Sequence, residues 1–414
     1  MVVIKPIWQE ASVRVLVALS KFQYGNPSWG VGPEYAAFVP AFQQLGHEVF
    51  HFDPWQPDRF VSFVDMNRAL LTEVDEKRPD VMFCSQVYYE YWIETLDLIR
   101  TRYGVTTLNW NSDDSWKYAQ VSKFLAPHYT AVTTTDERAY RRYHEDGIRN
   151  VLLTQWGARD EYLRRPKPAD TCKYDVTFVG AAHGPRKRWI ESLAGYGIRV
   201  TCFGRGWDTG PVDDKDIPEI MNDSVVSIGF ADSRGSNQIK ARTFEVPGAG
   251  GFLLTQRADG LDKYYNTGDE IVMFERVHDL ATSIRYYLSH PQERDAIAEA
   301  GYRRTCSEYV YSKITSQALS FALSLAPSNV VDRQVGSDFM GAATQRHRMS
   351  PWLSVLRSML VLLCSVLFGK TRGARAARRL VFEFSWRFQG ARTFTASGLP
   401  GRMFYRESRQ YRPE

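Results

Sequence analysis

The sequence is poor in cysteine, with five residues spread far apart along 414 positions. None of them forms a C-x-x-C pair or a zinc-type spacing, so we expect neither a disulfide framework nor a structural metal site. This cysteine usage favours a reducing compartment. The N-terminal stretch lacks a long apolar segment followed by a small-residue cleavage site, so we predict no secretory signal. Fixed-period repeats and low-complexity tracts are also missing. The 44% apolar content excludes an intrinsically disordered chain.

Several common catalytic motifs are missing too. The chain has no G-x-x-x-x-G-K-[ST], no G-x-S-x-G and no H-E-x-x-H, which argues against P-loop, α/β-hydrolase and zincin chemistry. Gly25, Gly30 and Gly32 do not make G-x-G-x-x-G, so a dinucleotide oxidoreductase is weakly supported. Asp214–Asp216 matches D-x-D by letter, but it precedes an expected helix, where acidic residues cap the helix and complement its dipole. We therefore predict no metal and no cofactor.

Charge is unevenly distributed along the chain. From Arg346 onward there are 14 Lys/Arg and 3 Asp/Glu, a balance of +11, whereas the remainder has 38 against 44, a balance of −6. A mildly acidic body excludes a nucleic-acid protein as a whole, and the basic tail is expected to meet an anionic partner.

Short apolar runs rich in Val, Ile and Phe alternate with longer helical patterns from Arg14 to about Gln256. The runs alternate little with polar residues, as in strands buried on both faces of a parallel sheet. The first set is expected at Val13–Leu19, Glu48–Phe52, Val81–Cys84, Val105–Leu108, Ala131–Thr134 and Val151–Leu153. The second set is expected at Tyr174–Val179, Arg199–Phe203, Val225–Ile228, Phe252–Thr255 and Ile271–Phe274. The pattern predicts an α/β fold with two doubly wound parallel sheets.

The expected organisation follows from these runs. The Pro-containing segment Arg164–Asp170 is interpreted as a linker between domain 1–165 and domain 166–308. A helix over 309–326 is expected to return toward the first domain, and 327–414 to form a loop-like linker over Pro327–Ser350 followed by a basic amphipathic tail. The expected helices in the body are Pro33–Leu45, Arg59–Lys77, Arg186–Tyr196, Val277–Ser289, Pro291–Glu308 and Tyr309–Leu325.

The tail opens with the apolar run Pro351–Phe368, followed by five Lys/Arg and a second aromatic patch, Phe382–Phe388. This pattern favours an amphipathic helix in the membrane interface with a basic segment on anionic headgroups. A membrane span and a helix packed on protein remain alternatives, although eighteen residues with a central Arg357 are short for a span.

Three strand-end segments of the second half carry candidate binding residues. A strand that ends at Gly180 leads to a basic helix start with Arg186 and Arg188, a suitable place for a diphosphate. A second strand ends at Gly204 and Arg205. The third segment combines side chains able to hold ribose hydroxyls and a diphosphate with a Gly-rich turn: Asn237, Lys240, Arg242, Glu245, Gly250 and Gly251. Each segment taken alone also fits a solvated turn or an ordinary capped helix.

Residues 174–307 resemble the C-terminal half of CgeB-like, group 1-type glycosyltransferases. The pieces F-V-G…R-K-R, Y-G-I-R-V-T-C-F-G-R-G-W and R-T-F-E-V-P-G-A-G-G-F-L-L-T occur in the family's order, followed by G-D-E-I-V-M-F. The resemblance implies a GT-B fold, with two Rossmann-like domains facing across a cleft. It implies a nucleotide-sugar donor whose ribose is held by Glu245 and whose diphosphate faces Arg186 or Arg188 with Lys240 or Arg242. One departure is Asn237, where many retaining members have an earlier Glu, so the sugar and the stereochemical outcome stay open.

The N-terminal half resembles the first β-loop-α-β unit of GT-B enzymes, where the loop with Gly30 and Gly32 is expected to meet donor or acceptor. His47, at the entry to a strand, is expected to be structural. Asp113 and Asp114 follow the fourth strand and could deprotonate an acceptor hydroxyl, or could cap the next helix.

The predicted function is therefore metal-independent transfer of a sugar from a nucleoside diphosphate to a glycan, cell-envelope or lipid-linked acceptor. The predicted location is cytoplasmic, peripheral on the inner face of the membrane, with an anionic membrane surface and no nucleic acid as partner. A non-catalytic nucleotide-sugar-binding maturation protein and a GT-B-fold sugar-nucleotide epimerase remain alternatives.

Overall fold

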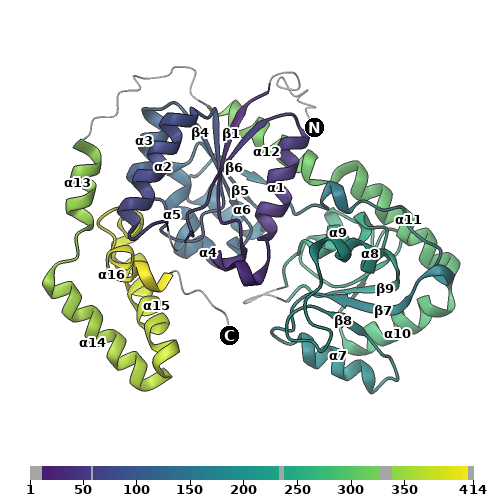
Figure 1. The fold of residues 1–414 in the computed structure, drawn as a ribbon. Helices are drawn as coiled ribbons and strands as arrows, with labels where there is room; N and C mark the ends of the chain where they lie inside the picture. Colours follow the sequence, from purple (N-terminus) through teal and green to yellow (C-terminus); the bar gives the residue numbers. More distant parts are fainter. Residues whose placement is uncertain (1–11, 57–58, 233–236, 327–337, 409–414) are drawn as a thin grey trace. The chain divides into compact units, whose positions relative to one another are not determined.

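The computed structural model describes residues 12–56, 59–232, 237–326 and 338–408, and these form two compact units (Figure 1). Unit 1 comprises Met1–Leu153 and Ser316–Glu414, and unit 2 comprises Thr154–Thr315. The chain passes from unit 2 back to unit 1 within helix α12 (Tyr311–Ser324). The segment expected to be a linker lies inside unit 2, where the Arg164 amide donates to the Gly248 carbonyl at 3.1 Å.

Unit 1 is built on a six-stranded parallel sheet in the order β2-β1-β3-β4-β5-β6. Its strands are β1 (Arg14–Ala18), β2 (Glu48–Phe52), β3 (Val81–Cys84), β4 (Thr106–Asn111), β5 (Ala131–Thr134) and β6 (Val151–Leu153). Because β2 pairs on one side of β1 and β3 on the other, the strand order reverses beside β1. The loops after β1 and β3 therefore diverge at the carboxyl edge, the place where such sheets bind ligands.

Helices cover the faces of the unit 1 sheet. The larger ones are α1 (Pro33–Gln44), α2 (Phe63–Lys77), α3 (Ile93–Thr101) and α6 (Glu137–Glu145). α1 begins where Pro33 occupies a first-turn position after Gly32, and α2 begins at Ser62, whose hydroxyl accepts from the Asp65 amide at 3.2 Å. After β4, the short α4 (Asp114–Lys117) runs into a π-helical turn, Tyr118–Ser122, and then α5 (Lys123–Leu125).

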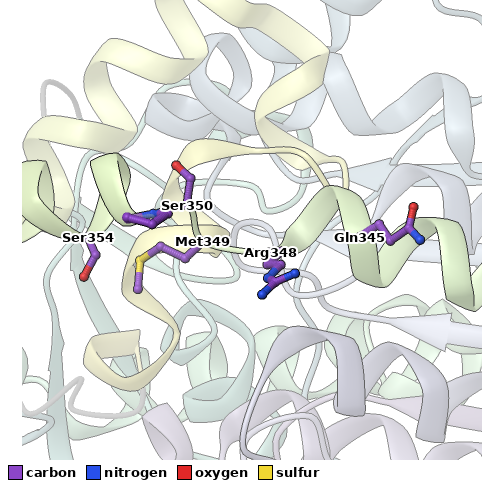
Figure 2. A pocket seen from close by; sticks show the side chains of 6 residues that line it. Gln345, Arg348, Met349, Ser350 and Ser354 are labelled. Carbon is purple, nitrogen blue, oxygen red and sulfur yellow. The ribbon is translucent and has the colours of Figure 1, made fainter.

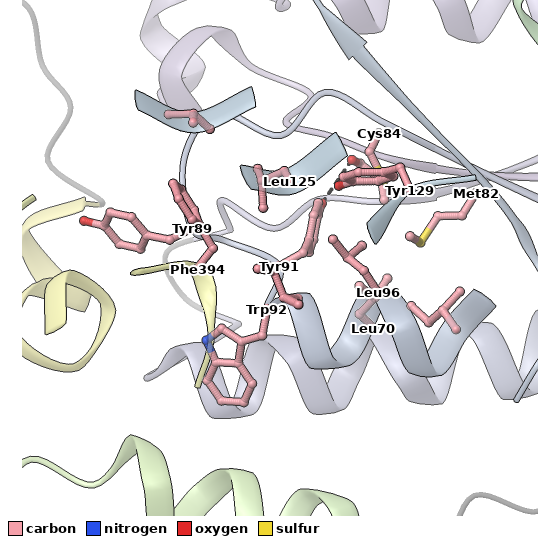
Figure 3. Packing of buried hydrophobic residues seen from close by; sticks show 14 of the residues in the cluster. Leu70, Met82, Cys84, Tyr89, Tyr91, Trp92, Leu96, Leu125, Tyr129 and Phe394 are labelled. Atoms are coloured by element: carbon pink, nitrogen blue, oxygen red, sulfur yellow. Dashed lines mark hydrogen bonds between the residues drawn. The ribbon is translucent and has the colours of Figure 1, made fainter. Parts of the chain in front are cut away.

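The C-terminal helices α13 (Asp338–His347), α14 (Pro351–Phe368), α15 (Lys370–Gln389) and α16 (Leu399–Ser408) belong to unit 1. The expectation of a loop over Pro327–Ser350 is wrong for the α13 residues, while 327–337 lie outside the described part of the chain. Phe382 and Phe394 are 3% and 0% exposed and join the core cluster that holds Tyr89 and Trp92. Figure 3 shows Phe394 in this cluster. Side chains from this C-terminal region therefore complete the core of unit 1.

Unit 2 carries a five-stranded parallel sheet in the order β11-β10-β9-β7-β8. Its strands are β7 (Tyr174–Val179), β8 (Thr201–Phe203), β9 (Ser224–Gly229), β10 (Leu253–Gln256) and β11 (Val272–Phe274). Its helices are α7 (Arg186–Ala194), α8 (Ile217–Asn222), α9 (Arg242–Gly248), α10 (Val277–Ser289) and α11 (Pro291–Glu308). The strand order reverses beside β7, so the loops after β7 and β9 diverge at the carboxyl edge of this sheet.

The predicted doubly wound α/β fold is confirmed, and all eleven expected strands are present. The largest difference in a strand is at β4, which continues to Asn111 beyond the expected end at Leu108. The extra residues include two buried amides that satisfy each other, since Asn109 Nδ2 donates to Asn111 Oδ1 at 2.8 Å.

Candidate functional site

Two strand-end loops of unit 2 approach each other backbone to backbone. The Gly180 amide donates to the Phe203 carbonyl at 2.8 Å, and Trp207 Nε1 donates to the Gly180 carbonyl at 2.8 Å. A Cβ on Gly204 would lie 2.4 Å from the Gly180 carbonyl oxygen, and Gly204 has a φ of +134°. Only glycine fits there without a backbone shift. The predicted glycines thus form a tight base at the carboxyl edge of the sheet.

Arg186 lies at this edge, on the first turn of α7. Its side chain is 12% exposed, and it donates from Nε to Asp232 Oδ1 at 3.3 Å and from Nη1 to the Ala181 carbonyl at 3.2 Å. Burial lowers the pKa of Arg186, and the carboxylate of Asp232 opposes that shift. Arg186 follows β7 and Asp232 follows β9, so this ion pair joins the two loops that diverge at the strand reversal.

Arg242 and Glu245 occupy the first turn of α9. Arg242 donates from Nη1 to Glu245 Oε2, and from Nε to the Val179 carbonyl at 3.2 Å. The Glu245 side chain is 10% exposed. The predicted ribose-binding carboxylate is therefore held in place by the cation three residues earlier, and this pair lies directly against the end of β7.

A further cation and a histidine complete the cluster. Lys240 donates to Gln238 Oε1 at 3.1 Å. The pKa of His183 is lowered first by burial, and also by the charges of Arg186 and Lys240. The structure therefore gathers three cations and two carboxylates at one edge of the unit 2 sheet. This group of Arg186, Lys240, Arg242, Asp232 and Glu245, with His183 and Gln238, is called the donor cluster below.

The remaining predicted residues differ in position. Arg188 is exposed on α7. Arg205 is exposed after β8, where its carbonyl accepts from the Ala182 amide at 2.8 Å, and Asn237 Nδ2 donates to the Arg257 carbonyl at 2.8 Å beside the end of β10, so these two residues also lie at the carboxyl edge. Gly250 and Gly251 precede β10 and so lie at the opposite, amino edge of the sheet. A Cβ on Gly250 would come within 2.6 Å of the Arg164 carbonyl oxygen, so this turn serves close packing within unit 2.

In unit 1, the two predicted carboxylates after β4 have different surroundings. Asp114 is 2% exposed and accepts hydrogen bonds from the hydroxyls of Ser122 and, at 3.0 Å, Tyr143. Burial raises the pKa of Asp114 to about 6, despite these hydrogen bonds. Asp113 is 44% exposed in its side chain and forms an ion pair with Lys117 Nζ at 3.5 Å. Of the two, Asp113 is the one accessible to an acceptor.

Two carboxylates that were not singled out from the sequence accompany Asp113. Glu34, on the first turn of α1, has its pKa raised by burial and by the charge of Asp113. Glu90, after β3, is 5% exposed, accepts from the Tyr88 amide at 2.7 Å, and also has its pKa raised by burial. Lys117, whose side chain is 14% exposed, lowers the pKa of both. We call Glu34, Glu90, Asp113 and Lys117 the acidic cluster.

The loop that leads to Glu34 contains the two predicted glycines. The Gln23 amide donates to the Gly30 carbonyl at 3.0 Å, and the Gly32 amide donates to the Lys21 carbonyl at 2.8 Å. Gly30 has a φ of +80°, which a side chain would strain. These contacts fold the loop after β1 so that α1 begins at the carboxyl edge. The signal for Glu34 in the sequence was its place just after this Gly-containing loop.

Asp214, in the predicted D-x-D segment, forms an ion pair. Asp214 binds the Arg159 guanidinium, with Nη2 to Oδ1 at 2.6 Å, so it pairs within unit 2 instead of capping α8. Among the described residues, no group of three or more His, Cys, Asp or Glu is placed to hold a metal ion.

A pocket of about 520 Å³ lies where α13 meets α14 (Figure 2). Its lining includes Arg348 but no carboxylate, and it shares no residue with either cluster.

Comparison with known proteins agrees with this architecture. Residues 186–320 match the family described as "Glycosyl transferase-like". Spore protein CgeB of Bacillus subtilis (strain 168) is 18% identical over 246 residues, which cover 52% of this chain and 75% of that protein.

Solved structures are similar over most of their length. A glycosyltransferase from Rickettsia africae ESF-5 has a TM-score of 0.55 at 11% identity, covering 77% of this chain and 100% of that one. Sucrose-phosphate synthase from Thermosynechococcus elongatus has a TM-score of 0.54 at 14% identity, covering 75% of this chain and 99% of that one. HepE of Anabaena, solved with UDP-glucose, has a TM-score of 0.53 at 11% identity, covering 75% of this chain and 100% of that one. The predicted GT-B fold and the resemblance to CgeB-like glycosyltransferases are thereby confirmed.

Proposed function

We propose that this protein transfers a glycosyl unit from a nucleoside-diphosphate sugar, bound by unit 2, to an acceptor hydroxyl. The observation that carries the proposal is the donor cluster. Arg186, Lys240, Arg242 and Glu245 meet at the carboxyl edge of a parallel sheet, beside the reversal of strand order where such sheets bind nucleotides. The match of residues 186–320 to a glycosyl transferase-like family supports the same chemistry.

The cluster suits the departure of a nucleoside diphosphate. As the bond to the anomeric carbon breaks, negative charge grows on the diphosphate, and the fixed cations Arg186, Lys240 and Arg242 stabilise it. Glu245 Oε1 stays available to accept from ribose hydroxyls, because Arg242 donates to the other carboxylate oxygen, Oε2. In this proposal, side chains compensate the charge of the leaving diphosphate, and no metal takes part.

On the acceptor side, we propose Asp113 as the general base of an inverting transfer. Its carboxylate accepts the proton of the acceptor hydroxyl as that oxygen attacks the anomeric carbon and the nucleoside diphosphate leaves. Asp114 is excluded from direct contact by burial under Ser122 and Tyr143, so it serves to hold the start of α4. The proposed acceptor is a glycan or a lipid-linked saccharide of the cell envelope.

Thermal shift against UDP-, GDP-, ADP- and CMP-sugars tests the donor class. One of these should raise the melting temperature by mass action, and Glu245→Gln with Arg242→Gln should reduce that rise at the same ligand concentration. Lys215→Gln, at a side chain that is 77% exposed, is the matched control and should leave the rise unchanged.

Product analysis then separates the alternatives. Transfer requires both an acceptor and release of the nucleoside diphosphate, whereas an epimerase yields an isomerised nucleotide sugar or free sugar without acceptor. Binding with no product would support a non-catalytic nucleotide-sugar-binding protein. If no nucleotide sugar shifts the wild-type melting temperature, the donor proposal is wrong.

A further inference from the structure

We propose that the hairpin of α14 and α15 docks unit 1 on an anionic lipid membrane, with α14 lying in the plane of the interface. This goes beyond the proposed function, because it concerns a surface that neither cluster uses. By length and composition, α14 is one helix among the described residues that could cross a membrane, yet only 11% of it is buried.

The outward face of α14 is apolar and open. Trp352, Leu362 and Val366 are 68%, 68% and 76% exposed, and further large apolar side chains of α14 are more than half exposed. Taken together, the exposed apolar side chains of α14 recur every three or four residues, which places them on one stripe of the helix. On α15, Phe384 and Phe388 add an exposed aromatic pair, with ring centroids 4.6 Å apart. Contiguous exposed apolar side chains of this kind mark surfaces that bind proteins or membranes.

The inward face of the hairpin is fixed to unit 1. Leu353 and Cys364 are buried with side chains of α15 and α16, and a Cβ on Gly373 would lie 2.2 Å from Ser365 Oγ, so the two helices are in close contact. Phe382 of α15 packs on Tyr88, with ring centroids 5.1 Å apart. The outward stripe is therefore held on a rigid support and cannot fold back into the core of the hairpin.

Charge complementarity identifies the partner as an anionic membrane. The hairpin, residues 351–389, contains seven Lys/Arg and one Asp/Glu, and Lys370 and Arg372 are exposed at the start of α15. An apolar stripe beside a basic segment is the pattern of helices that lie in an anionic lipid interface. A second copy of the same surface would bring like charges together, which disfavours self-association through this face.

Length and attachment favour lying in the interface over crossing it. Eighteen helical residues span about 27 Å, less than the roughly 30 Å of a bilayer core. Arg357 lies in the middle of α14 with its guanidinium 5.6 Å from the Phe404 ring centre, so it faces α16 and away from the apolar stripe. Crossing would also pull the basic α15, and Phe382 with it, out of unit 1.

Helix α15 also carries a cation whose charge acts on the acidic cluster. The charge of Arg378 on α15 lowers the pKa of Glu90. If the proposed function holds, docking through α14 attaches the acceptor side of unit 1 to the membrane, which suits a lipid-linked acceptor.

Flotation of the full chain with phosphatidylcholine vesicles, with and without phosphatidylglycerol, tests the proposal. The intact protein should float with the anionic vesicles. Trp352→Ser/Leu362→Ser/Val366→Ser should weaken binding about a hundredfold or more, since three apolar side chains lose their transfer free energy. Lys370→Gln/Arg372→Gln should weaken it about fivefold for each charge removed, and less at high salt. Point variants are used because deletion of α15 would remove Phe382 from the core.

Val61→Ser/Leu288→Ser, at exposed apolar side chains outside the hairpin, is the matched control and should bind as the wild type does. The proposal is overturned if the wild type does not bind anionic vesicles, or if the triple variant binds as well as the wild type. It is also overturned if light scattering shows a wild-type dimer that the triple variant converts to a monomer, because the face would then hold a second copy. Vesicle binding needs no turnover, so its failure and the failure of the proposed function are distinguishable.

Discussion

Replacing Asp114 by Asn should remove a pH dependence of stability that burial imposes on unit 1. Asp114 is 2% exposed, and its pKa in the folded protein is about 6 against an ordinary value of 3.8. The folded protein therefore binds a proton between these two values that the unfolded chain does not. Stability from this group is present below pH 4 and is lost as the pH rises through 6. A shift of about two units corresponds to about 3 kcal/mol.

Asn has the shape of Asp but does not ionise in this range. The Ser122 hydroxyl can still donate to Oδ1, and the Tyr143 hydroxyl can turn to accept from the new amide. Urea unfolding of both proteins at several pH values between 4 and 8 gives the difference in unfolding free energy. We expect that difference to move by about 3 kcal/mol in favour of the variant as the pH rises. If the difference in unfolding free energy does not change with pH, or changes in favour of the wild type as the pH rises, the assignment of a raised pKa to Asp114 is refuted.

Three further predictions concern separate parts of the chain. Gly204→Ala should destabilise unit 2 by more than about 1 kcal/mol in urea unfolding, because its Cβ meets the Gly180 carbonyl and its φ is positive; an unchanged midpoint would contradict the close approach. Arg186→Gln should lower affinity for the donor found by thermal shift about tenfold or more in calorimetry, since it removes a cation from the diphosphate; unchanged affinity would exclude Arg186 from the site. Phe382→Ala should destabilise unit 1 by about 3–5 kcal/mol, whereas the exposed Phe388→Ala should cost little, and equal effects would place α15 outside the core.

The strands could be predicted from the sequence because their signal is local. Runs such as Val81–Cys84 are buried on both faces and consist of the residue types that fully covered parallel sheets require. Polar strand residues escape this pattern. Asn109 and Asn111 belong to β4 because their amides are satisfied by each other and by the Gln86 amide, which no local periodicity reveals.

The tail shows the same limit on a larger scale. The apolar run at Pro351–Phe368 predicted a helix, and α14 has the same bounds. α13 was missed because little of it is buried, with Ala343 and His347 as its buried side chains, so its helical periodicity is weak. That Phe382 and Phe394 complete the core of unit 1 depends on contacts with residues some 300 positions earlier, which the sequence pattern does not carry.

The candidate site was predictable where side chains follow strand ends. Arg186 was identified because it follows the end of a strand. Arg242 and Glu245 were identified because a short charged helix followed by a Gly-rich turn resembles the donor site of the family. Asp232, His183 and Glu34 were missed, since their importance lies in charges contributed by other loops. Gly250 and Gly251 were included because a Gly-rich turn resembles a ligand loop, but their position before β10 puts them at the wrong edge of the sheet.

Calorimetric titration of the nucleotide sugar selected by thermal shift into the wild type, Arg242→Gln/Glu245→Gln and Lys215→Gln tests the donor cluster most directly. Saturable one-to-one binding is expected for the wild type and the Lys215 variant. The double variant should lose at least tenfold in affinity, because it removes the cation that faces the diphosphate and replaces the charged acceptor of the ribose hydroxyls with a weaker, neutral one. Equal affinity in all three proteins would contradict a donor site at the carboxyl edge of unit 2.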